Sequence, residues 1–128
     1  MIYIDDLLGT PFKIHGRDKL GYDCYGLVIE VLNRYGFSLI DLYESYTKEN
    51  YLDLMAKDAY TVVVKSNLTK IEQPTESDIL LFFDEQGRTT HVGVYLGKDK
   101  FIHCDGRGVN VTKLSTYFRT WEAYKWHK

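Results

Sequence analysis

The stretch that decides the fold is Gly21–Val28, which reads GYDCYGLV and opens a helical pattern that ends at Gly36. Within this pattern apolar residues recur at the spacing that fills one face of a helix. Asp23 has the side chain of an N-cap residue, and Gly36 suits the position after the last turn. The sequence therefore predicts a helix that begins at about residue 24 and ends before residue 36.

Cys24 falls in the first turn of this predicted helix. Free backbone N–H groups and the positive end of the helix dipole favour a thiolate there, so the cysteine is a candidate nucleophile if a histidine comes close. The alternative is a buried core cysteine, because an unpaired cysteine behaves as a small apolar residue. Position alone does not choose between the two interpretations.

Length and composition describe an ordinary globular chain. It has 128 residues, 45% of them hydrophobic, and a formal net charge of −2. We therefore expect a single domain over 1–128 and no nucleic-acid surface. The first residues, MIYIDD, include no basic segment followed by an apolar run, and no stretch approaches the roughly 18 apolar residues of a membrane span. We expect synthesis in the cytoplasm without a signal peptide, and no membrane span.

The N-terminal half is predicted to be mainly helical. A short helix is expected at 3–9, a loop at 12–21 and a second helix at 44–58, with a short β-like run at 61–64.

The C-terminal half is predicted to form an antiparallel sheet. Three apolar runs are separated by short glycine-containing turns, which is typical of a meander. Two further strands are expected nearer the C-terminus. The five runs are Ile79–Phe83, Val92–Leu96, Phe101–Cys104, Val109–Val111 and Tyr124–Trp126. Helices followed by strands predict an α+β fold in which N-terminal helices pack on a central antiparallel sheet of about five strands.

Strand geometry brings two histidines together. If Leu96 faces Lys100, then His103 lies opposite Gly93, and His91 lies diagonally across from it on the same face. A one-residue change of register would separate the histidines. One imidazole can deprotonate a thiol while a second polar group holds that imidazole in place. A histidine on a strand can equally be an ordinary surface residue.

Two other arrangements of these residues are less favoured. A zinc site built from Cys24, His91, His103 and Cys104 is disfavoured because adjacent residues on a strand point to opposite faces, and no paired-ligand spacing is present. A Cys24–Cys104 disulfide is unexpected in a chain with no export signal. The sequence predicts no metal and no cofactor.

Taken together, these motifs resemble the NlpC-type (NlpC/p-sixty) family of papain-like cysteine peptidases, which hydrolyse bacterial cell-wall peptides. The resemblance extends over most of the chain. Its motifs, in order, are Gly9–Phe12, Asp23–Val28, Pro74–Phe83, His91–Gly97 and Phe101–His103.

The resemblance implies a papain-like fold and a role for each member of a Cys-His-His set. Cys24 would be the nucleophile, His91 the base and His103 the orienting residue. The backbone N–H of Cys24 would help to form the oxyanion hole. Asp23 would bind the free amino end of a peptidoglycan stem peptide. The bond cleaved would be the amide between the γ-carboxyl of D-glutamate and a diamino acid.

Several residues depart from the family pattern. Phe12 replaces the usual tyrosine, the bulky Tyr25 replaces the usual serine, and His15 stands where glycine is frequent. These three residues join Asp23 as expected substrate-binding residues, with specificity left open. Ser77 also replaces a common glycine in the turn before the sheet.

The departures Phe12 and Tyr25, together with the expected single-domain organisation, resemble the phage tail-associated members of the family. This resemblance predicts tail-tip proteins as partners, and a location in the virion tail or delivery to the cell wall. The alternatives are a tail assembly protein that retains the peptidase fold with little turnover, a thiol-based acyltransferase or lipid hydrolase, and an interbacterial toxin.

Overall fold

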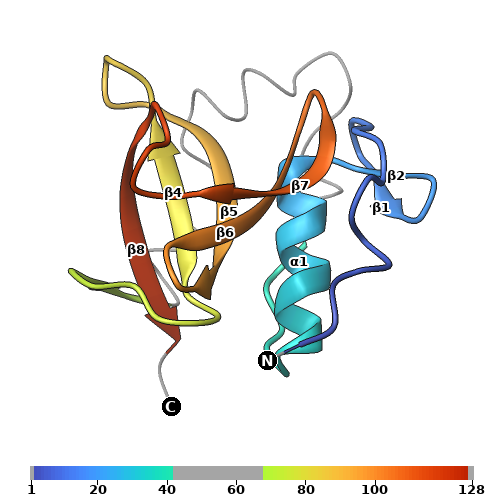
Figure 1. Cartoon of the computed structure of the whole chain (residues 1–128), viewed down its shortest axis with the longest axis horizontal. Helices are drawn as coiled ribbons and strands as arrows, with labels where there is room; N and C mark the ends of the chain where they lie inside the picture. The colour runs from blue at the N-terminus through green and yellow to red at the C-terminus, as the bar shows by residue number, and fades with distance from the viewer. Residues whose placement is uncertain (1, 42–67, 127–128) are drawn as a thin grey trace.

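The computed structural model describes residues 2–41 and 68–126, in which one helix packs against a six-stranded antiparallel sheet (Figure 1). The strand order in this sheet is β3-β8-β4-β5-β6-β7, and a separate two-stranded hairpin is formed by β1 and β2. The elements are β1 (Arg17–Asp18), β2 (Gly21–Tyr22), α1 (Cys24–Arg34), β3 (Leu68–Ile71), β4 (Ile79–Phe83), β5 (Thr89–Gly97), β6 (Lys100–Asp105), β7 (Gly108–Lys113) and β8 (Thr120–Trp126).

Both ends of α1 lie where the sequence predicts them. The carboxylate of Asp23 accepts a hydrogen bond of 2.7 Å from the backbone N–H of Gly26, as an N-cap does. At the other end Gly36 has a φ of +92°, which is the left-handed conformation of a residue that follows a helix. The N–H of Phe37 then donates to the carbonyl of Leu32 at 2.9 Å, which closes the last turn.

The main core lies between α1 and one face of the sheet. The apolar face of the helix supplies Leu27, Val28, Val31 and Leu32, all fully buried. α1 packs against β5 and β6, which follow each other in the meander. A smaller apolar cluster covers the other face, with Leu80, Phe82, Phe101, Leu114 and Ala123. β4 contributes to both clusters, which explains why its sequence is a continuous apolar run.

The predicted meander is confirmed. Strands β4, β5, β6 and β7 are neighbours in chain order, and β8 adds to the free side of β4. Strands β7 and β8 correspond to the predicted fourth and fifth strands. The sheet has six strands instead of about five because β3 pairs with β8 at the edge. This strand has only four residues, two of them exposed, so it has no apolar pattern to reveal it.

The register of β5 and β6 is the predicted one in the body of the strands. Val94 pairs with Ile102, and continuing the ladder by one residue places His103 opposite Gly93. The predicted pairing of Leu96 with Lys100 is wrong. Lys100 pairs with Gly97, because an irregularity between residues 95 and 97 absorbs one residue at the turn.

Two expectations for the N-terminal region are also wrong. Residues 5–9 form turns and not a short helix, with Leu7 N–H donating to the carbonyl of Ile4 at 2.9 Å. Gly9 has a φ of +84°, and its N–H donates to Val109 of β7, so the chain is fixed to the sheet instead of continuing a helix. The predicted loop 12–21 contains the β1–β2 hairpin, whose strands of two residues give no periodic signal. The predicted helix 44–58 and β-like run 61–64 lie outside the described residues.

Ser77, the residue that replaces a common glycine, has a φ of +79°. This left-handed conformation is strained for a residue with a Cβ atom, which is the physical reason for a glycine at such a place. The turn is fixed by hydrogen bonds from Ser77 N–H to Tyr95 and from Asp78 N–H to Thr75, of 2.9 and 3.1 Å.

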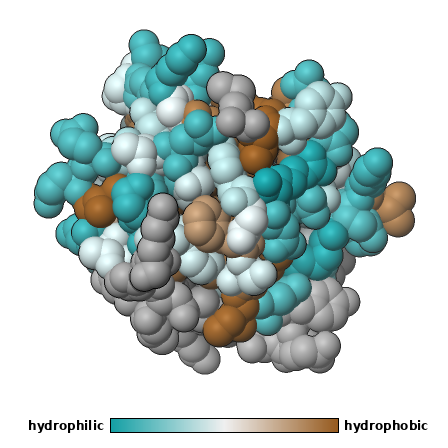
Figure 2. All heavy atoms as spheres, turned by 90° about the horizontal axis from the view of Figure 1, so that it is seen from below, coloured by the Kyte–Doolittle hydropathy of each residue, from teal (hydrophilic) through white to brown (hydrophobic). Residues whose placement is uncertain are grey.

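No helix within the described ranges is long and apolar enough to cross a membrane. On the face shown in Figure 2, apolar atoms occur in small separate groups among hydrophilic ones.

Candidate active site

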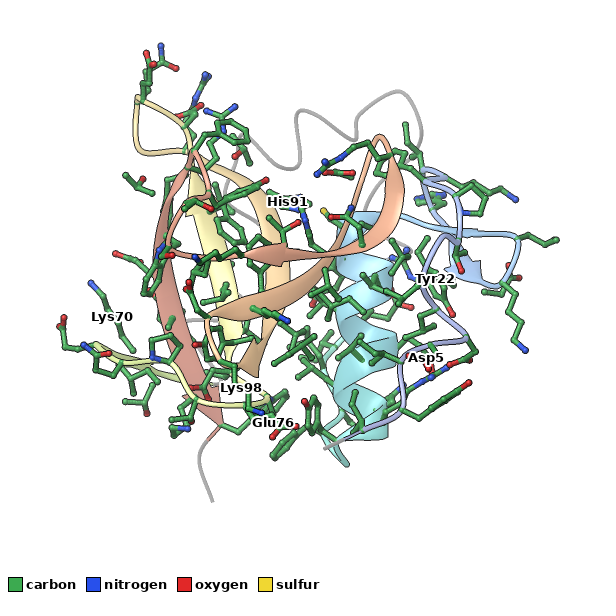
Figure 3. The ribbon with its side chains drawn as sticks, in the orientation of Figure 1. Asp5, Tyr22, Lys70, Glu76, His91 and Lys98 are labelled. Carbon is green, nitrogen blue, oxygen red and sulfur yellow. The ribbon has the colours of Figure 1, made fainter. Side chains whose placement is uncertain are left out.

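Cys24 is the first residue of α1, directly after the N-cap Asp23. Its side chain is buried, and the helix packs against β5 and β6, the strands that carry the two histidines. Figure 3 shows His91 level with the N-terminal end of α1. The helix N-terminus supplies free N–H groups and a positive dipole end, both of which favour a thiolate.

His91 and His103 are in direct contact. The Nε2 atom of His91 lies 2.7 Å from the Nδ1 atom of His103, and the two rings meet edge to face with their centroids 4.9 Å apart. Gly93 makes room for this contact. A Cβ atom there would lie 3.0 Å from the carbonyl oxygen of Ile102 and 3.4 Å from the Cβ of His103. The predicted pairing of the two histidines on one face is therefore confirmed.

Burial keeps both imidazole rings neutral. Desolvation, and secondly the neighbouring His103, lower the pKa of His91 to about 3. Desolvation also lowers the pKa of His103 to about 4, although the carboxylate of Asp105 opposes this shift. Since both values lie well below 7, each ring carries one proton at neutral pH. A neutral imidazole has one donor nitrogen and one acceptor nitrogen, and only the acceptor can act as a base.

Cys104 lies on the opposite side of its strand from His103. Its thiol is buried among the main core residues and donates to the carbonyl of Tyr22 at 3.1 Å. Burial, and secondly the nearby Cys24, raise the pKa of Cys104 to about 12, so this thiol stays protonated. No disulfide joins Cys24 and Cys104. This placement contradicts the alternative zinc site, and no cluster of three metal-binding side chains occurs in the described parts of the chain.

Asp23 is fully buried, and both oxygens of its carboxylate accept hydrogen bonds. One oxygen accepts from Gly26 N–H and from Arg17 Nη1 at 2.7 and 3.0 Å, and the other accepts from His15 N–H at 3.1 Å. Arg17 also pairs with the exposed Asp41. The carboxylate thus joins the β1–β2 hairpin to the start of α1. Its expected contact with a substrate amino group stays a prediction.

The remaining expected substrate-binding residues occupy different environments. Tyr25 is fully buried, and its hydroxyl donates to the carbonyl of Ile40 at 2.6 Å, so it supports the site from within and presents no surface to a ligand. Phe12 is half-buried against the core, and its backbone forms an isolated β-bridge with Tyr22. His15 is half-buried with a φ of +68° and is tied through its N–H to Asp23.

Three polar residues behind His103 were not identified from the sequence. The Nε2 atom of His103 lies 2.8 Å from the hydroxyl of Thr112, which donates to the side-chain oxygen of Asn110 at 2.7 Å. Asn110 in turn donates to Asp105 at 3.2 Å. The alternation of side chains along β7 could have identified them. Asn110 pairs with His103, and Thr112, two residues further on, lies on the same face of the sheet.

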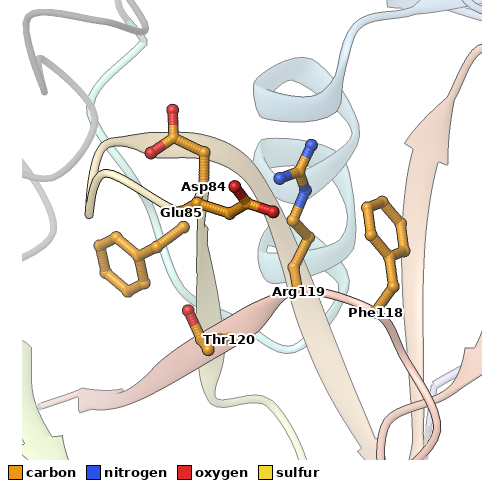
Figure 4. A pocket seen from close by; sticks show the side chains of 6 residues that line it. Asp84, Glu85, Phe118, Arg119 and Thr120 are labelled. Atoms are coloured by element: carbon orange, nitrogen blue, oxygen red, sulfur yellow. The ribbon is translucent and has the colours of Figure 1, made fainter.

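A small hollow adjoins the aromatic residues around the histidines. It has a volume of about 130 Å³ and is lined from the end of β4 and the start of β8 by Phe83, Asp84, Glu85, Phe118, Arg119 and Thr120 (Figure 4). The ring of the exposed Phe118 lies 4.9 Å from the ring of Tyr117, which lies 5.6 Å from that of His103. The guanidinium of Arg119 lies 4.7 Å from the Phe118 ring centre. The hollow offers a cation and an aromatic ring near the histidines.

The site combines a cysteine at a helix N-terminus with two neutral histidines in direct contact, on elements that pack against each other. In comparison with known proteins, residues 9–127 match the NlpC/P60 family, and the chain belongs to that family.

Several members of the family resemble this chain in sequence. "Probable peptidoglycan endopeptidase LytE" of Bacillus subtilis is 28% identical over 112 residues, which cover 88% of this chain and 28% of that protein. The "Gamma-D-glutamyl-L-lysine dipeptidyl-peptidase" of the same organism is 24% identical over 110 residues, covering 84% of this chain and 32% of that protein. The chain thus spans about a third or less of the length of these curated relatives.

Solved structures agree with the fold. The NlpC/p60 domain of the peptidoglycan hydrolase SagA is 28% identical, with a TM-score of 0.60, and the match covers 89% of this chain and 86% of that one. NlpC2 from Trichomonas vaginalis has a TM-score of 0.69 at 22% identity, with 95% of this chain and 43% of that chain covered. The second likeness supports the fold alone.

Proposed function

We propose that the protein is a cysteine peptidase that hydrolyses peptidoglycan stem peptides, with Cys24, His91 and His103 as the catalytic set. The observation that carries the proposal is the direct contact between His91 Nε2 and His103 Nδ1 at 2.7 Å, on strands that pack against the helix that begins at Cys24. Because Nε2 of His91 faces His103, Nδ1 is the nitrogen left to accept the thiol proton.

The proposed reaction has two steps. In the first, Nδ1 of His91 takes the proton of Cys24, the thiolate attacks the amide carbonyl, and the amine leaves with a proton returned by His91. The backbone N–H groups at the start of α1 stabilise the developing oxyanion. In the second step, water activated by His91 hydrolyses the thioester and releases the carboxylic acid.

The proposed bond is the amide between the γ-carboxyl of D-glutamate and a diamino acid. Support comes from the relative named "Gamma-D-glutamyl-L-lysine dipeptidyl-peptidase" and from family membership over residues 9–127.

The experiment is mass spectrometry of purified peptidoglycan fragments after incubation with the wild-type protein, with Cys24→Ala and with Cys104→Ala. Cys104 is the matched control because it is a second buried cysteine whose thiol stays protonated. We expect new fragments that end at D-glutamate with wild type and Cys104→Ala, and none with Cys24→Ala. Equal cleavage by Cys24→Ala would refute the proposed nucleophile.

An absence of fragments from all three folded proteins would instead favour the assembly or acyl-transfer alternatives.

We further propose, from the aromatic residues Phe12 and Tyr25, that the protein is associated with a phage tail. Its recovery from purified virions tests this location, and its absence from them would contradict it.

A further inference from the structure

We infer that Thr112, Asn110 and Asp105 form a directional donor chain behind the histidines, fixing each imidazole as the tautomer that leaves Nδ1 of His91 free to act as a base. This inference rests on the proposed function for its catalytic consequence, but the tautomers can be observed without catalysis. The donor chain runs His91, His103, Thr112, Asn110, Asp105.

The direction of the donor chain is set at its far end. The side-chain nitrogen of Asn110 lies 2.9 Å from the carbonyl oxygen of Gly108 and 3.2 Å from a carboxylate oxygen of Asp105. Both partners can only accept hydrogen bonds, so the nitrogen must face them and the amide oxygen must face Thr112. The amide of Asn110 therefore has a single orientation that satisfies its neighbours.

The hydroxyl of Thr112 transmits this direction to His103. Its one hydrogen is donated to the amide oxygen of Asn110 at 2.7 Å. Toward His103 Nε2, which lies 2.8 Å away, the hydroxyl oxygen can only accept. The hydrogen of the neutral His103 ring is therefore on Nε2, and its Nδ1 carries a lone pair.

The same reasoning fixes His91. The lone pair on Nδ1 of His103 requires a donor, and the atom 2.7 Å away is Nε2 of His91. His91 therefore carries its hydrogen on Nε2, which leaves the lone pair of Nδ1 for the thiol proton. The opposite tautomer of His103 would put the shared hydrogen on its own Nδ1, so that Nε2 of His91 would accept it and the hydrogen of His91 would lie on Nδ1, where it could not act as a base.

The donor chain also ends on a negative charge. Every hydrogen in it points away from His91 and toward the carboxylate of Asp105, which is held by Arg107 at 2.8 Å. When Nδ1 of His91 takes the proton of Cys24, the S–H bond breaks and an N–H bond forms. The resulting positive charge faces a series of oriented dipoles, and the proton stays on His91. Thr112, Asn110 and Asp105 are therefore positioning residues and do not touch the substrate.

The histidine tautomers can be read directly by ¹⁵N NMR of imidazole nitrogens in the full chain carrying Cys24→Ala, which needs no substrate. We expect both His91 and His103 to be protonated at Nε2. Adding Thr112→Val removes the hydroxyl at nearly constant volume, and we expect His103 to become a mixture of tautomers. Thr112→Ser is the matched control because it keeps the hydroxyl, so we expect it to keep the wild-type pattern.

Protonation of Nδ1 in either histidine, or an unchanged pattern with Thr112→Val, would overturn the inference. In the active protein we expect Thr112→Val to lower kcat about 10-fold or more with little change in KM, and Thr112→Ser to restore most of the rate. Failure of the wild type to cleave peptidoglycan would refute the proposed function, while the NMR result would still decide the donor chain.

Discussion

His91 Nε2 and His103 Nδ1 lie 2.7 Å apart on neighbouring antiparallel strands, and both rings are kept neutral by burial. A contact this short between two imidazoles requires one ring to donate and the other to accept. The contact between the two rings therefore depends on three features: the space left by Gly93 opposite His103, the register of β5 and β6, and the polar residues of β7.

Gly93→Ala tests the space that the histidines need. The added Cβ would lie 3.0 Å from the carbonyl oxygen of Ile102 and 3.1 Å from the ring of Phe101, which is closer than ordinary contact. We expect a loss of stability of about 1–3 kcal/mol from overpacking, and a larger loss of kcat than of substrate affinity because His103 is displaced. Urea unfolding and steady-state kinetics measure both, and a variant with wild-type stability would contradict the tight packing.

The lowered pKa values of the two histidines predict that the free energy of unfolding decreases as the pH falls. Their pKa values in the folded state, about 3 and about 4, lie below the ordinary value of 6.5. At pH values between the folded and the ordinary pKa, the unfolded chain binds more protons than the folded protein. The free energy of unfolding therefore falls as the pH is lowered from about 7 to about 4. Each histidine contributes a slope of up to about 1.4 kcal/mol per pH unit.

Urea unfolding at several pH values measures this slope. The carboxylates whose pKa is lowered, such as Asp6 and Asp84, lose their contribution only below about pH 4, so they do not affect the range from pH 5 to 7. The control is a variant with His91→Gln and His103→Gln, for which we expect a flatter dependence. An equally steep dependence in that variant would show that other groups are responsible.

Asp23→Ala tests the hydrogen bonds that connect the β1–β2 hairpin to the start of α1. The change removes the N-cap acceptor and leaves Arg17 without its buried partner. We expect a loss of at least about 2 kcal/mol, the upper end for a lost N-cap, measured by chemical denaturation. Lys70→Ala is the control because it removes only the exposed pair with Glu122, for which we expect less than about 1 kcal/mol. Similar losses in the two variants would contradict the structural role of Asp23.

Tyr25→Ser restores the residue that the family commonly has after the nucleophile. Here the ring is fully buried and its hydroxyl donates to Ile40 at 2.6 Å, so serine would leave a cavity. We expect a loss of about 3–5 kcal/mol, as for other buried aromatic residues that are truncated. Tyr25→Phe removes only the hydrogen bond, and we expect about 1 kcal/mol. A thermal or urea unfolding series that ranks the two variants in the opposite order would contradict this packing.

The sequence by itself determined the local features of this protein. The cap residue Asp23, the terminating Gly36 and the apolar spacing between them specify α1, because each acts within a few residues of chain. The alternation of apolar residues specified the meander, and its register placed His91 and His103 on one face. These signals were sufficient to identify the candidate nucleophile and its two histidines.

Only the tertiary structure decided the features that depend on distant partners. The short strand β3 exists because β8 offers it an edge, and residues 5–9 turn because Gly9 bonds to β7. The direction of the donor chain behind His103 depends on how the side chains of Thr112 and Asn110 on the neighbouring strand β7 are hydrogen-bonded, which alternation alone does not specify. The pairings of β3 and of residues 5–9 leave no periodic pattern in the sequence, since the free energy that holds them comes from pairing and burial between segments far apart in the chain.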